Sequence, residues 1–283
     1  MSLDPIGIFD SGVGGLSVLK EVKTLLPHED IEYLADQVHV PYGERSIEDV
    51  LQYSEGIARF FIELRVKLIV VACNTASAVA LHHLRGKFPG IPFVGMEPAV
   101  KPAAESTLSG MVGVLATPAT FHGELYASVV ERFANGVTII QDTCPGLVSQ
   151  IEKGELFSSE TLLILQNALS PMMKQGVDRI VLGCTHYPFV IPLITKIVGP
   201  KIQVIDPAPA VALQVERVMV AEGFLTDKRE SGQLRAFSSG DPEQLVSVGS
   251  ELLGHSLSVT PVRWQDDDSL AYFDKGQPSR LIN

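Results

Sequence analysis

The sequence predicts an α/β protein of two similar lobes, each built on a mainly parallel sheet. Short apolar runs alternate with helical stretches, as in repeated strand–helix–strand units. Two segments also resemble each other: residues 67–77 are KLIVVACNTAS and residues 179–189 are RIVLGCTHYPF. A second pair, GIFDSG at 7–12 and GVLATP at 113–118, precedes them in the same order. We therefore predict an internal duplication with pseudo-two-fold symmetry and an active site in the cleft between the lobes.

The expected elements follow the apolar runs in order along the chain. A helix over residues 46–64 is indicated by Ser46 as N-cap, by Asp49 three residues later and by apolar residues at helical spacing. Further helices are expected over 211–221 and after the Gly240-Asp241-Pro242 turn. The expected strands cover residues 6–9, 31–34, 68–72, 93–95, 112–116, 137–141, 180–182, 204–205 and 234–237.

Two passages rich in proline and small residues, near 96–102 and 206–209, are interpreted as crossings between the lobes. The first lobe is then expected to comprise residues 1–97 plus 208–283, and the second lobe residues 98–207. In this division the C-terminal segment completes the sheet of the first lobe.

Composition restricts the classes of function. The chain has 283 residues, 46% of them hydrophobic, and a formal net charge of −11. Because phosphate contacts dominate nucleic-acid affinity, an acidic chain with no evident basic stripe is not expected to bind nucleic acid or an anionic membrane. No run approaches the roughly 20 apolar residues of a membrane helix, and the N-terminus lacks the pattern of a signal peptide, so we expect a cytoplasmic protein.

Three cysteines, Cys73, Cys144 and Cys184, form neither a disulfide framework nor a metal-ligand pattern. Cys144 lies in a turn with no counterpart in the other half and is expected to be a buried core residue. Cys73 and Cys184 each follow a strand and precede polar residues. We expect each thiol near a helix N-terminus, where a thiolate is favoured, although burial as a small apolar residue is the alternative.

A helix terminus alone is too weak to activate these thiols. Half ionisation at neutral pH requires lowering a thiol pKa by about 1.5, which costs about 2 kcal/mol. A helix N-terminus supplies about 0.3–1 kcal/mol, so a neighbour must assist. His186 is two residues from Cys184, and Asp10 reaches Cys73 if their strands are neighbours. Their alternative roles are capping a helix and fixing a glycine turn.

The glycine-rich segment 10–15, DSGVGG, is expected to form a tight turn whose backbone N–H groups approach a carboxylate. It departs from the dinucleotide fingerprint because Ser17 stands where the third glycine would be, and it lacks the Gly-Lys-Ser/Thr of a P-loop. His82 and His83, on a helix, and Lys67, before a strand, are expected to be solvated.

The motifs GIFDSGVGG, PYGERS, ACNTAS and GCTHYP, in this order, resemble the glutamate racemases of bacterial cell-wall synthesis, from about residue 6 to residue 209. The resemblance implies racemisation without a cofactor or metal, with Cys73 and Cys184 as acid and base on opposite faces of the substrate α-carbon. It also implies that Asp10 assists Cys73, that His186 assists Cys184, and that Glu152 supports the histidine. Substrate contacts are implied for Asp10, Ser11, Pro41, Tyr42, Gly43, Asn74, Thr75, Thr117, Thr120, Thr185 and His186.

Other functions stay open at this point. An aspartate racemase would handle a substrate one methylene shorter, a difference that sequence does not resolve. A non-catalytic amino-acid-binding protein would keep both cysteines in its core. A thiol redox protein is disfavoured because its cysteines should be close neighbours. The resemblance further implies glutamate as the small-molecule substrate and a homodimer.

Overall fold

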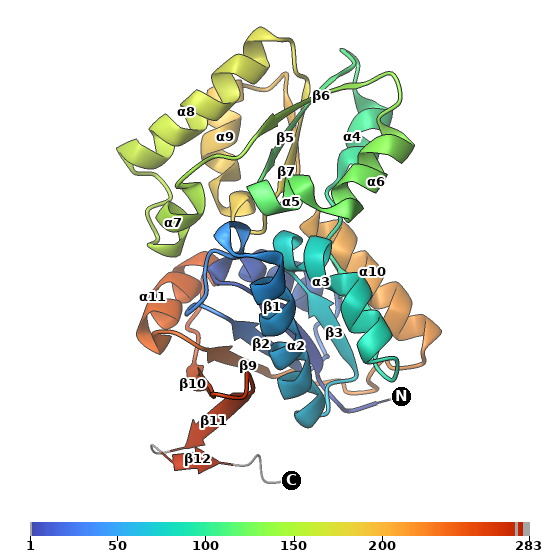
Figure 1. Ribbon diagram of the computed structural model, residues 1–283, viewed down its shortest axis with the longest axis vertical. Helices are drawn as coiled ribbons and strands as arrows, with labels where there is room; N and C mark the ends of the chain where they lie inside the picture. The colour runs from blue at the N-terminus through green and yellow to red at the C-terminus, as the bar shows by residue number, and fades with distance from the viewer. Residues whose placement is uncertain (1, 275–276, 280–283) are drawn as a thin grey trace.

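The computed structural model describes residues 2–274 and 277–279 and shows two α/β lobes stacked along the long axis (Figure 1). Within these residues the strands form two sheets. The larger sheet has eight strands in the order β12-β11-β10-β9-β2-β1-β3-β4, and the smaller has four in the order β6-β5-β7-β8. The predicted fold class, with mainly parallel sheets, is confirmed.

The two sheets repeat one connectivity. In each lobe the first strand in the chain pairs in parallel with both the second and the third, and the fourth pairs with the third. The matched strands, larger sheet first, are β1 (Ile6–Asp10) with β5 (Met111–Ala116), β2 (Ile31–Ala35) with β6 (Thr138–Asp142), β3 (Leu68–Val71) with β7 (Arg179–Gly183), and β4 (Phe93–Gly95) with β8 (Gln203–Ile205). This shared order confirms the predicted duplication.

The C-terminal segment extends the larger sheet beyond β2. Strand β9 (Leu234–Ser238) pairs in parallel with β2, and β10 (Val259–Trp264) pairs in parallel with β9. Strands β11 (Leu270–Asp274) and β12 (Gln277–Ser279) continue in antiparallel fashion and project from the end of the lobe away from the smaller sheet (Figure 1). Residues 234–279 thus add strands to the lobe that carries the N-terminus, while the exact lobe limits at 97 and 207 stay a prediction.

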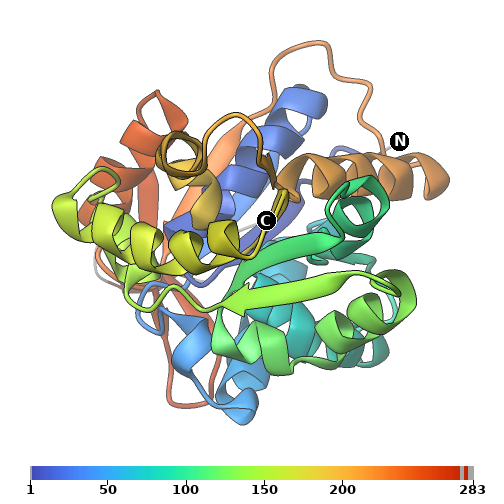
Figure 2. The same cartoon turned by 90° about the horizontal axis from the view of Figure 1, so that it is seen from above.

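Helices cover both faces of each sheet, as Figure 2 shows from above. In the larger lobe, α1 packs against α10 and α11, and α2 packs against α3. In the smaller lobe, α4 and α5 contact α6, and α8 contacts α7 and α9. The helices are α1 (Leu16–Leu25), α2 (Ile47–Glu63), α3 (Asn74–Lys87), α4 (Val100–Ser106), α5 (Pro118–His122), α6 (Glu124–Phe133), α7 (Leu147–Glu152), α8 (Ser159–Lys174), α9 (Ile191–Val198), α10 (Ala208–Ala221) and α11 (Pro242–Leu253), with short 3₁₀ turns η1 (Val13–Gly15), η2 (Tyr42–Glu44) and η3 (Tyr187–Val190).

Local sequence signals account for several boundaries. Ser46 caps α2 as predicted, because its hydroxyl accepts the Asp49 N–H at 3.1 Å. Asp241 caps α11, where Pro242 occupies the first helical position and Gly254 ends the helix in the left-handed region. Asp241 and Pro242 thus set the start of α11, shortly after the end of β9.

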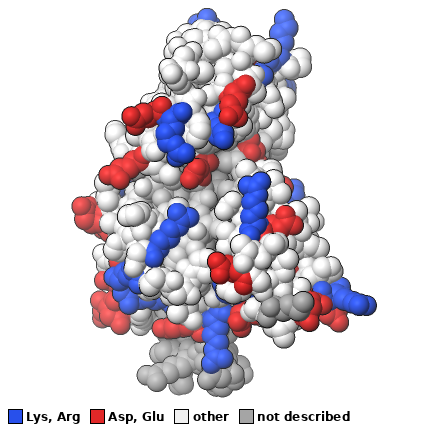
Figure 3. Space-filling model, turned by 90° about the vertical axis from the view of Figure 1, so that its right-hand side faces the viewer, with Lys and Arg blue, Asp and Glu red and all other residues white. Residues whose placement is uncertain are grey.

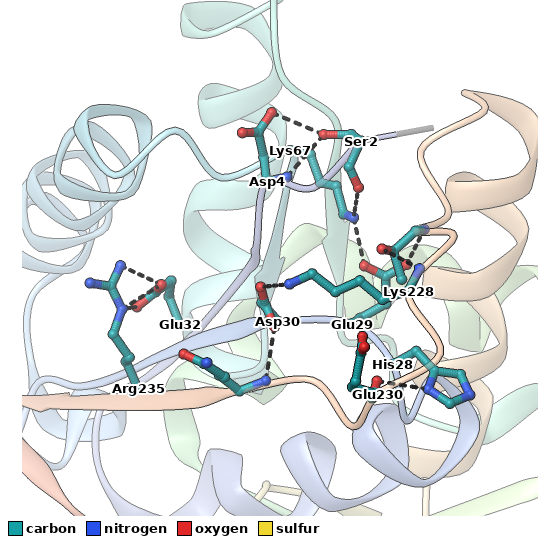
Figure 4. Close-up of polar contacts among 12 residues, drawn as sticks. Ser2, Asp4, His28, Glu29, Asp30, Glu32, Lys67, Lys228, Glu230 and Arg235 are labelled. Atoms are coloured by element: carbon teal, nitrogen blue, oxygen red, sulfur yellow. Dashed lines mark hydrogen bonds and ion pairs between the residues drawn. The ribbon is translucent and has the colours of Figure 1, made fainter. Parts of the chain in front are cut away.

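The prediction that Lys67 is solvated is wrong. Its side chain is buried at the start of β3, where Nζ lies 2.6 Å from Glu29 Oε2 and 3.0 Å from the Ser2 carbonyl oxygen (Figure 4). Glu29 also accepts the Thr226 N–H at 2.8 Å. Nearby, Arg235 holds Glu32 through two nitrogens and Lys228 pairs with Asp30 (Figure 4). The burial of Lys67 and Glu29 is tolerated because the two charges are paired.

The surface agrees with a mixed charge distribution. On the face shown in Figure 3, lysine and arginine side chains are interspersed with aspartate and glutamate rather than gathered in a stripe. Across residues 2–274 and 277–279, the helices are all too short or too polar to cross a bilayer.

Candidate active site

The two cysteines predicted to be reactive line one small cavity between the lobes. Cys73 follows β3 and Cys184 follows β7, so each stands at the carboxyl end of the third strand of its lobe. The cavity is about 10 Å³ in volume, about the space of one water molecule. Its lining consists of Ser11, Pro41, Tyr42, Gly43, Cys73, Asn74, Thr75, Thr117, Val148, Gly183, Cys184, Thr185 and His186.

Cys73 lies at the N-terminus of a full helix. It is the N-cap of α3, and its Sγ accepts the Ala76 N–H at 3.5 Å. Burial raises the pKa of Cys73 well above its ordinary value, and the negative charge of nearby Asp10 raises it further. In this state Cys73 is a protonated thiol and therefore a proton donor.

Asp10, at the end of β1, fixes the glycine turn and lies beside Cys73. Its Oδ2 accepts the Gly15 N–H at 2.6 Å, which fixes the glycine turn, and the Thr185 hydroxyl at 3.1 Å. The carboxyl group is fully buried, and burial raises its pKa, although His186 and Cys73 oppose that effect. Because parallel neighbours β1 and β3 end together, Asp10 lies close enough to influence the thiol of Cys73.

Cys184 has a different environment from Cys73. The prediction of a helix N-terminus at both thiols holds fully for Cys73, whereas Cys184 precedes the short 3₁₀ turn η3. Its Sγ lies 3.7 Å from His186 Nδ1. The opposite nitrogen, Nε2, lies 2.5 Å from Glu152 Oε1 on α7. His186 thus bridges the thiol and a carboxylate, and its side chain forms no helix cap.

The charge state of His186 follows from these neighbours. Burial lowers the pKa of His186, but the hydrogen bonds and negative charges of Cys184 and Glu152 outweigh it and hold the pKa well above its ordinary value. These neighbours favour the protonated, imidazolium form of the ring. A cation beside Cys184 stabilises negative charge on its sulfur, which is what a base at this position requires.

The glycine turn lets the two lobes approach closely. A Cβ at Gly12 would lie 1.8 Å from Glu152 Oε1, and one at Gly14 would lie 2.4 Å from His186 Nδ1. The Val13 N–H, from the larger lobe, donates to Glu152 Oε1 at 2.8 Å. The backbone N–H groups of this turn do approach carboxylates, as expected, and these carboxylates are the protein's own Glu152 and Asp10.

Hydroxyl groups meet across the cleft on the Cys73 side. Thr75 Oγ1 lies 2.9 Å from Thr117 Oγ1, which lies 3.0 Å from Thr120 Oγ1. Gly43 lies against Thr117, where its missing Cβ leaves room for the threonine side chain. Both polar atoms of the buried Asn74 amide lack a hydrogen-bond partner within the described residues. An unpaired buried amide beside a thiol is a group available to a ligand.

The structure brings together the predicted site residues in two layers. Ser11, Pro41, Tyr42, Gly43, Asn74, Thr75, Thr117, Thr185 and His186 line the cavity with both cysteines. Asp10, Glu152 and Thr120 stand behind this lining and contact it through hydrogen bonds. Sequence reasoning missed Val148 and Gly183. Gly183 immediately precedes Cys184 and corresponds to Ala72 in the repeat, so its place in the repeat could have identified it. No pattern in the sequence marks Val148.

The described residues include no group of three or more His, Cys, Asp or Glu side chains arranged to hold a metal ion. Cys144 is buried, as predicted for a core residue.

A family model described as Asp/Glu/Hydantoin racemase matches residues 6–215, which include every candidate residue named above. The chain belongs to this family. It is 49% identical over 248 residues to the glutamate racemase of Roseiflexus sp. (strain RS-1), covering 87% of this chain and 91% of that one.

Solved structures of glutamate racemases have the same fold. The Francisella tularensis enzyme in complex with D-glutamate superposes with a TM-score of 0.79 at 31% identity, covering 90% of this chain and 95% of that one. The Escherichia coli enzyme in complex with L-glutamate and the activator UDP-MurNAc-ala also gives a TM-score of 0.79, at 33% identity, covering 91% and 97%. These complexes indicate that racemases of this fold bind both enantiomers of one small amino acid.

Proposed function

We propose that the chain is a cofactor-independent glutamate racemase that interconverts L- and D-glutamate and supplies D-glutamate for peptidoglycan synthesis. The observation that carries the proposal is the placement of Cys73 and Cys184, one from each lobe, on a shared cavity with different helpers. The similarity to glutamate racemases over most of the chain supports glutamate as the substrate.

The first step is proton removal by the thiolate of one cysteine. We assign Cys184, 3.7 Å from His186, as the base in one direction, and Cys73, beside Asp10, as the acid. The Cα–H bond breaks, its proton forms an S–H bond on Cys184, and the electron pair remains on Cα and its carboxylate. Cys73 then donates its S–H proton to the opposite face of Cα, which leaves a thiolate on Cys73 beside Asp10. The product state has the reverse protonation.

The carbanion requires electrostatic stabilisation, because the proposed reaction uses no electron-accepting cofactor. Donors around the cavity, including the Asn74 amide and the hydroxyls of Thr75 and Thr185, are placed to bind the substrate carboxylate as charge develops on it. Exclusion of water strengthens these interactions. Both thiols are buried, which limits their contact with water.

Solvent-deuterium incorporation at Cα tests this function. We expect exchange of both L- and D-glutamate in D₂O, with racemisation abolished in Cys73→Ser and in Cys184→Ser. Near-native racemisation by both variants would exclude the two-base mechanism. Faster exchange of aspartate than of glutamate would identify an aspartate racemase, and binding without exchange would identify an amino-acid-binding protein.

The proposal also includes a cytoplasmic homodimer, as the resemblance to glutamate racemases implies. Sedimentation velocity at micromolar concentration tests the assembly, and a monomer at all concentrations would contradict it.

A further inference from the structure

The turn that holds Tyr42 over the cavity is tied to a buried carboxylate outside the cavity lining. Pro41, Tyr42 and Gly43 line the cavity together with Cys73. The Tyr42 side chain is buried, and its hydroxyl donates to Asp36 Oδ2 at 2.6 Å. The phenol therefore anchors to Asp36 a turn whose three residues all line the cavity.

Asp36 gathers donors from several parts of the chain. Oδ2 also lies 2.8 Å from His39 Nδ1, while Oδ1 accepts the Ser239 hydroxyl at 2.6 Å and the Trp264 indole N–H at 2.8 Å. Its side chain is fully buried. A buried carboxylate is tolerated only where donors satisfy it, and both oxygens of Asp36 are satisfied here.

Asp36 is also joined to the catalytic strand. Its backbone N–H donates to the Asp10 carbonyl oxygen at 2.9 Å, immediately beyond the β1–β2 pairing. Around it, the rings of His39 and Tyr53 stack with centroids 3.7 Å apart, and Trp264 packs against Tyr53 at 5.8 Å. The carboxylate thus links the end of β1, the Pro41–Gly43 turn and the C-terminal strand β10.

We propose that Asp36 is a positioning residue for racemisation: by accepting the Tyr42 hydroxyl it fixes the Pro41–Gly43 turn over Cys73 and the bound substrate. This inference rests on the proposed function. Trp264 and Ser239 hold Asp36 in turn, which gives the C-terminal segment a role in the site although it lies outside the cavity. Tyr42 serves as a donor throughout, because burial and then the charge of Asp36 raise its pKa well above its ordinary value.

Kinetics of two variants test the bond between Tyr42 and Asp36. Tyr42→Phe keeps the ring and deletes the hydroxyl, and Asp36→Asn keeps the shape and removes the charge. We expect each to raise KM for glutamate at least tenfold. Because both substitutions remove the same bond, the double variant should raise KM by no more than about the larger of the two single factors. A KM increase in the double variant equal to the product of the two single increases would show that Tyr42 and Asp36 act independently and would overturn the proposal.

A matched control separates positioning from stability. Tyr126 is a buried tyrosine of the smaller lobe whose hydroxyl accepts from Gln141 at 2.9 Å, away from the cavity. Tyr126→Phe should lower Tm comparably to Tyr42→Phe and leave KM and kcat unchanged. Trp264→Phe, which removes one donor to Asp36, should raise KM by a smaller factor than Asp36→Asn. Unchanged KM and kcat in Tyr42→Phe and Asp36→Asn would reduce Asp36 to a structural residue.

Inactive wild-type protein would mean that the proposed function is wrong. The role of Asp36 in holding the turn can then still be tested, because the reactivity of Cys73 toward an alkylating agent does not depend on enzyme activity. Cys73 is 5% exposed. Loosening the turn should increase its rate of alkylation by iodoacetamide at least tenfold in Asp36→Asn, measured by peptide mass spectrometry, while the Cys73 rate in Tyr126→Phe should equal that of the wild type. Equal Cys73 rates in wild type and variant would overturn the proposal whatever the activity.

Discussion

At the scale of single residues, the two halves match in placement and differ in the charged groups beside their thiols. In the repeat, Asp10 of the first half corresponds to Ala116 of the second, so the smaller lobe lacks a carboxylate at that strand end. Its thiol relies instead on His186, backed by Glu152 from α7. Cys73 is therefore flanked by an anion and Cys184 by a cation. Opposite charges beside the two thiols favour opposite protonation states, and a two-base reaction needs one thiol and one thiolate.

Removing the charge of Glu152 should change the titration of His186. In Glu152→Gln, burial still lowers the pKa of His186 while one of the two groups that raise it becomes neutral. We expect the His186 pKa to fall, as measured by NMR of ¹³C- or ¹⁵N-labelled imidazole. His83, paired with Glu55 on the surface, supplies a reference resonance. An unchanged His186 pKa would show that Glu152 does not set the charge of the ring.

The same variant has a defined pH dependence of stability. A histidine whose pKa is raised in the folded state stabilises the protein fully below its unfolded pKa of about 6.5, and this stabilisation is lost as the pH rises through the folded pKa. The stability difference between wild type and Glu152→Gln should therefore be largest at about pH 6 and narrow at higher pH. Denaturant titrations at a series of pH values measure it, and a gap that widens with pH would contradict the assignment.

At the scale of elements, the glycine turn η1 is the contact that joins the lobes most closely. Gly12→Ala would place a Cβ against Glu152 Oε1, the atom that accepts both the Val13 N–H and His186 Nε2. The carboxylate ends a flexible side chain and can rotate away, so we expect a folded protein in which Glu152 is displaced. Misplacement by about 1 Å costs about 100-fold in rate, which is the expected loss in kcat/KM.

Gly86→Ala is the matched control for that prediction. Gly86 lies in helix α3, and a Cβ there would meet no atom within 4 Å. Alanine should stabilise the helix by about 0.5–1 kcal/mol and leave the kinetics unchanged. Full activity in Gly12→Ala would show that the close approach of η1 and α7 is not needed for turnover.

The buried pair of Lys67 and Glu29 belongs to the larger sheet, where it ties the starts of β2 and β3 to the segment that leads into β9. Lys67→Met leaves Glu29 buried without its cation and should cost about 3–5 kcal/mol of unfolding free energy. Adding Glu29→Gln removes the uncompensated charge and should recover part of that loss. Urea unfolding measures both.

The surface pair of Lys87 and Glu55 provides the comparison. Its lysine side chain is 39% exposed, so Lys87→Met should cost no more than about 1 kcal/mol. Equal losses for Lys67→Met and Lys87→Met would show that burial adds nothing to the first pair.

At the scale of the whole molecule, the sequence predicts those features of the fold that are marked by local sequence patterns occurring in both halves. The strand–cysteine units and the GIFDSG and GVLATP turns predicted the shared sheet order, because a duplicated chain segment folds by the same local rules. Burial of Lys67 could not be predicted, since it depends on Glu29 and Ser2, which are far from it in sequence. The contact of Trp264 with Asp36 spans 228 residues and carries no local signal.

The lobes must separate to admit substrate, because a cavity of about 10 Å³ is far smaller than glutamate. They are joined unequally. On the η1 side a continuous buried cluster includes Leu16 of the larger lobe and Ile151 and Tyr187 of the smaller. On the opposite side, Tyr42 and Val114 belong to different buried clusters, and the lobes meet through Gly43, Thr75 and Thr117. Opening on this second side breaks a few polar contacts and exposes less apolar surface, so it costs less free energy.

Hydrogen exchange distinguishes the two sides. Without ligand, backbone amides in residues 42–45 should exchange faster than those in residues 13–17, where the Val13 N–H is bonded across the cleft. Saturating glutamate stabilises the closed arrangement and should slow exchange at 42–45, while α8, on the outer face of the smaller lobe, stays unchanged as an internal reference. Identical rates with and without glutamate would contradict closure around the substrate. Faster exchange at 13–17 would place the opening on the other side, because the apolar cluster there would then be the weaker of the two contacts.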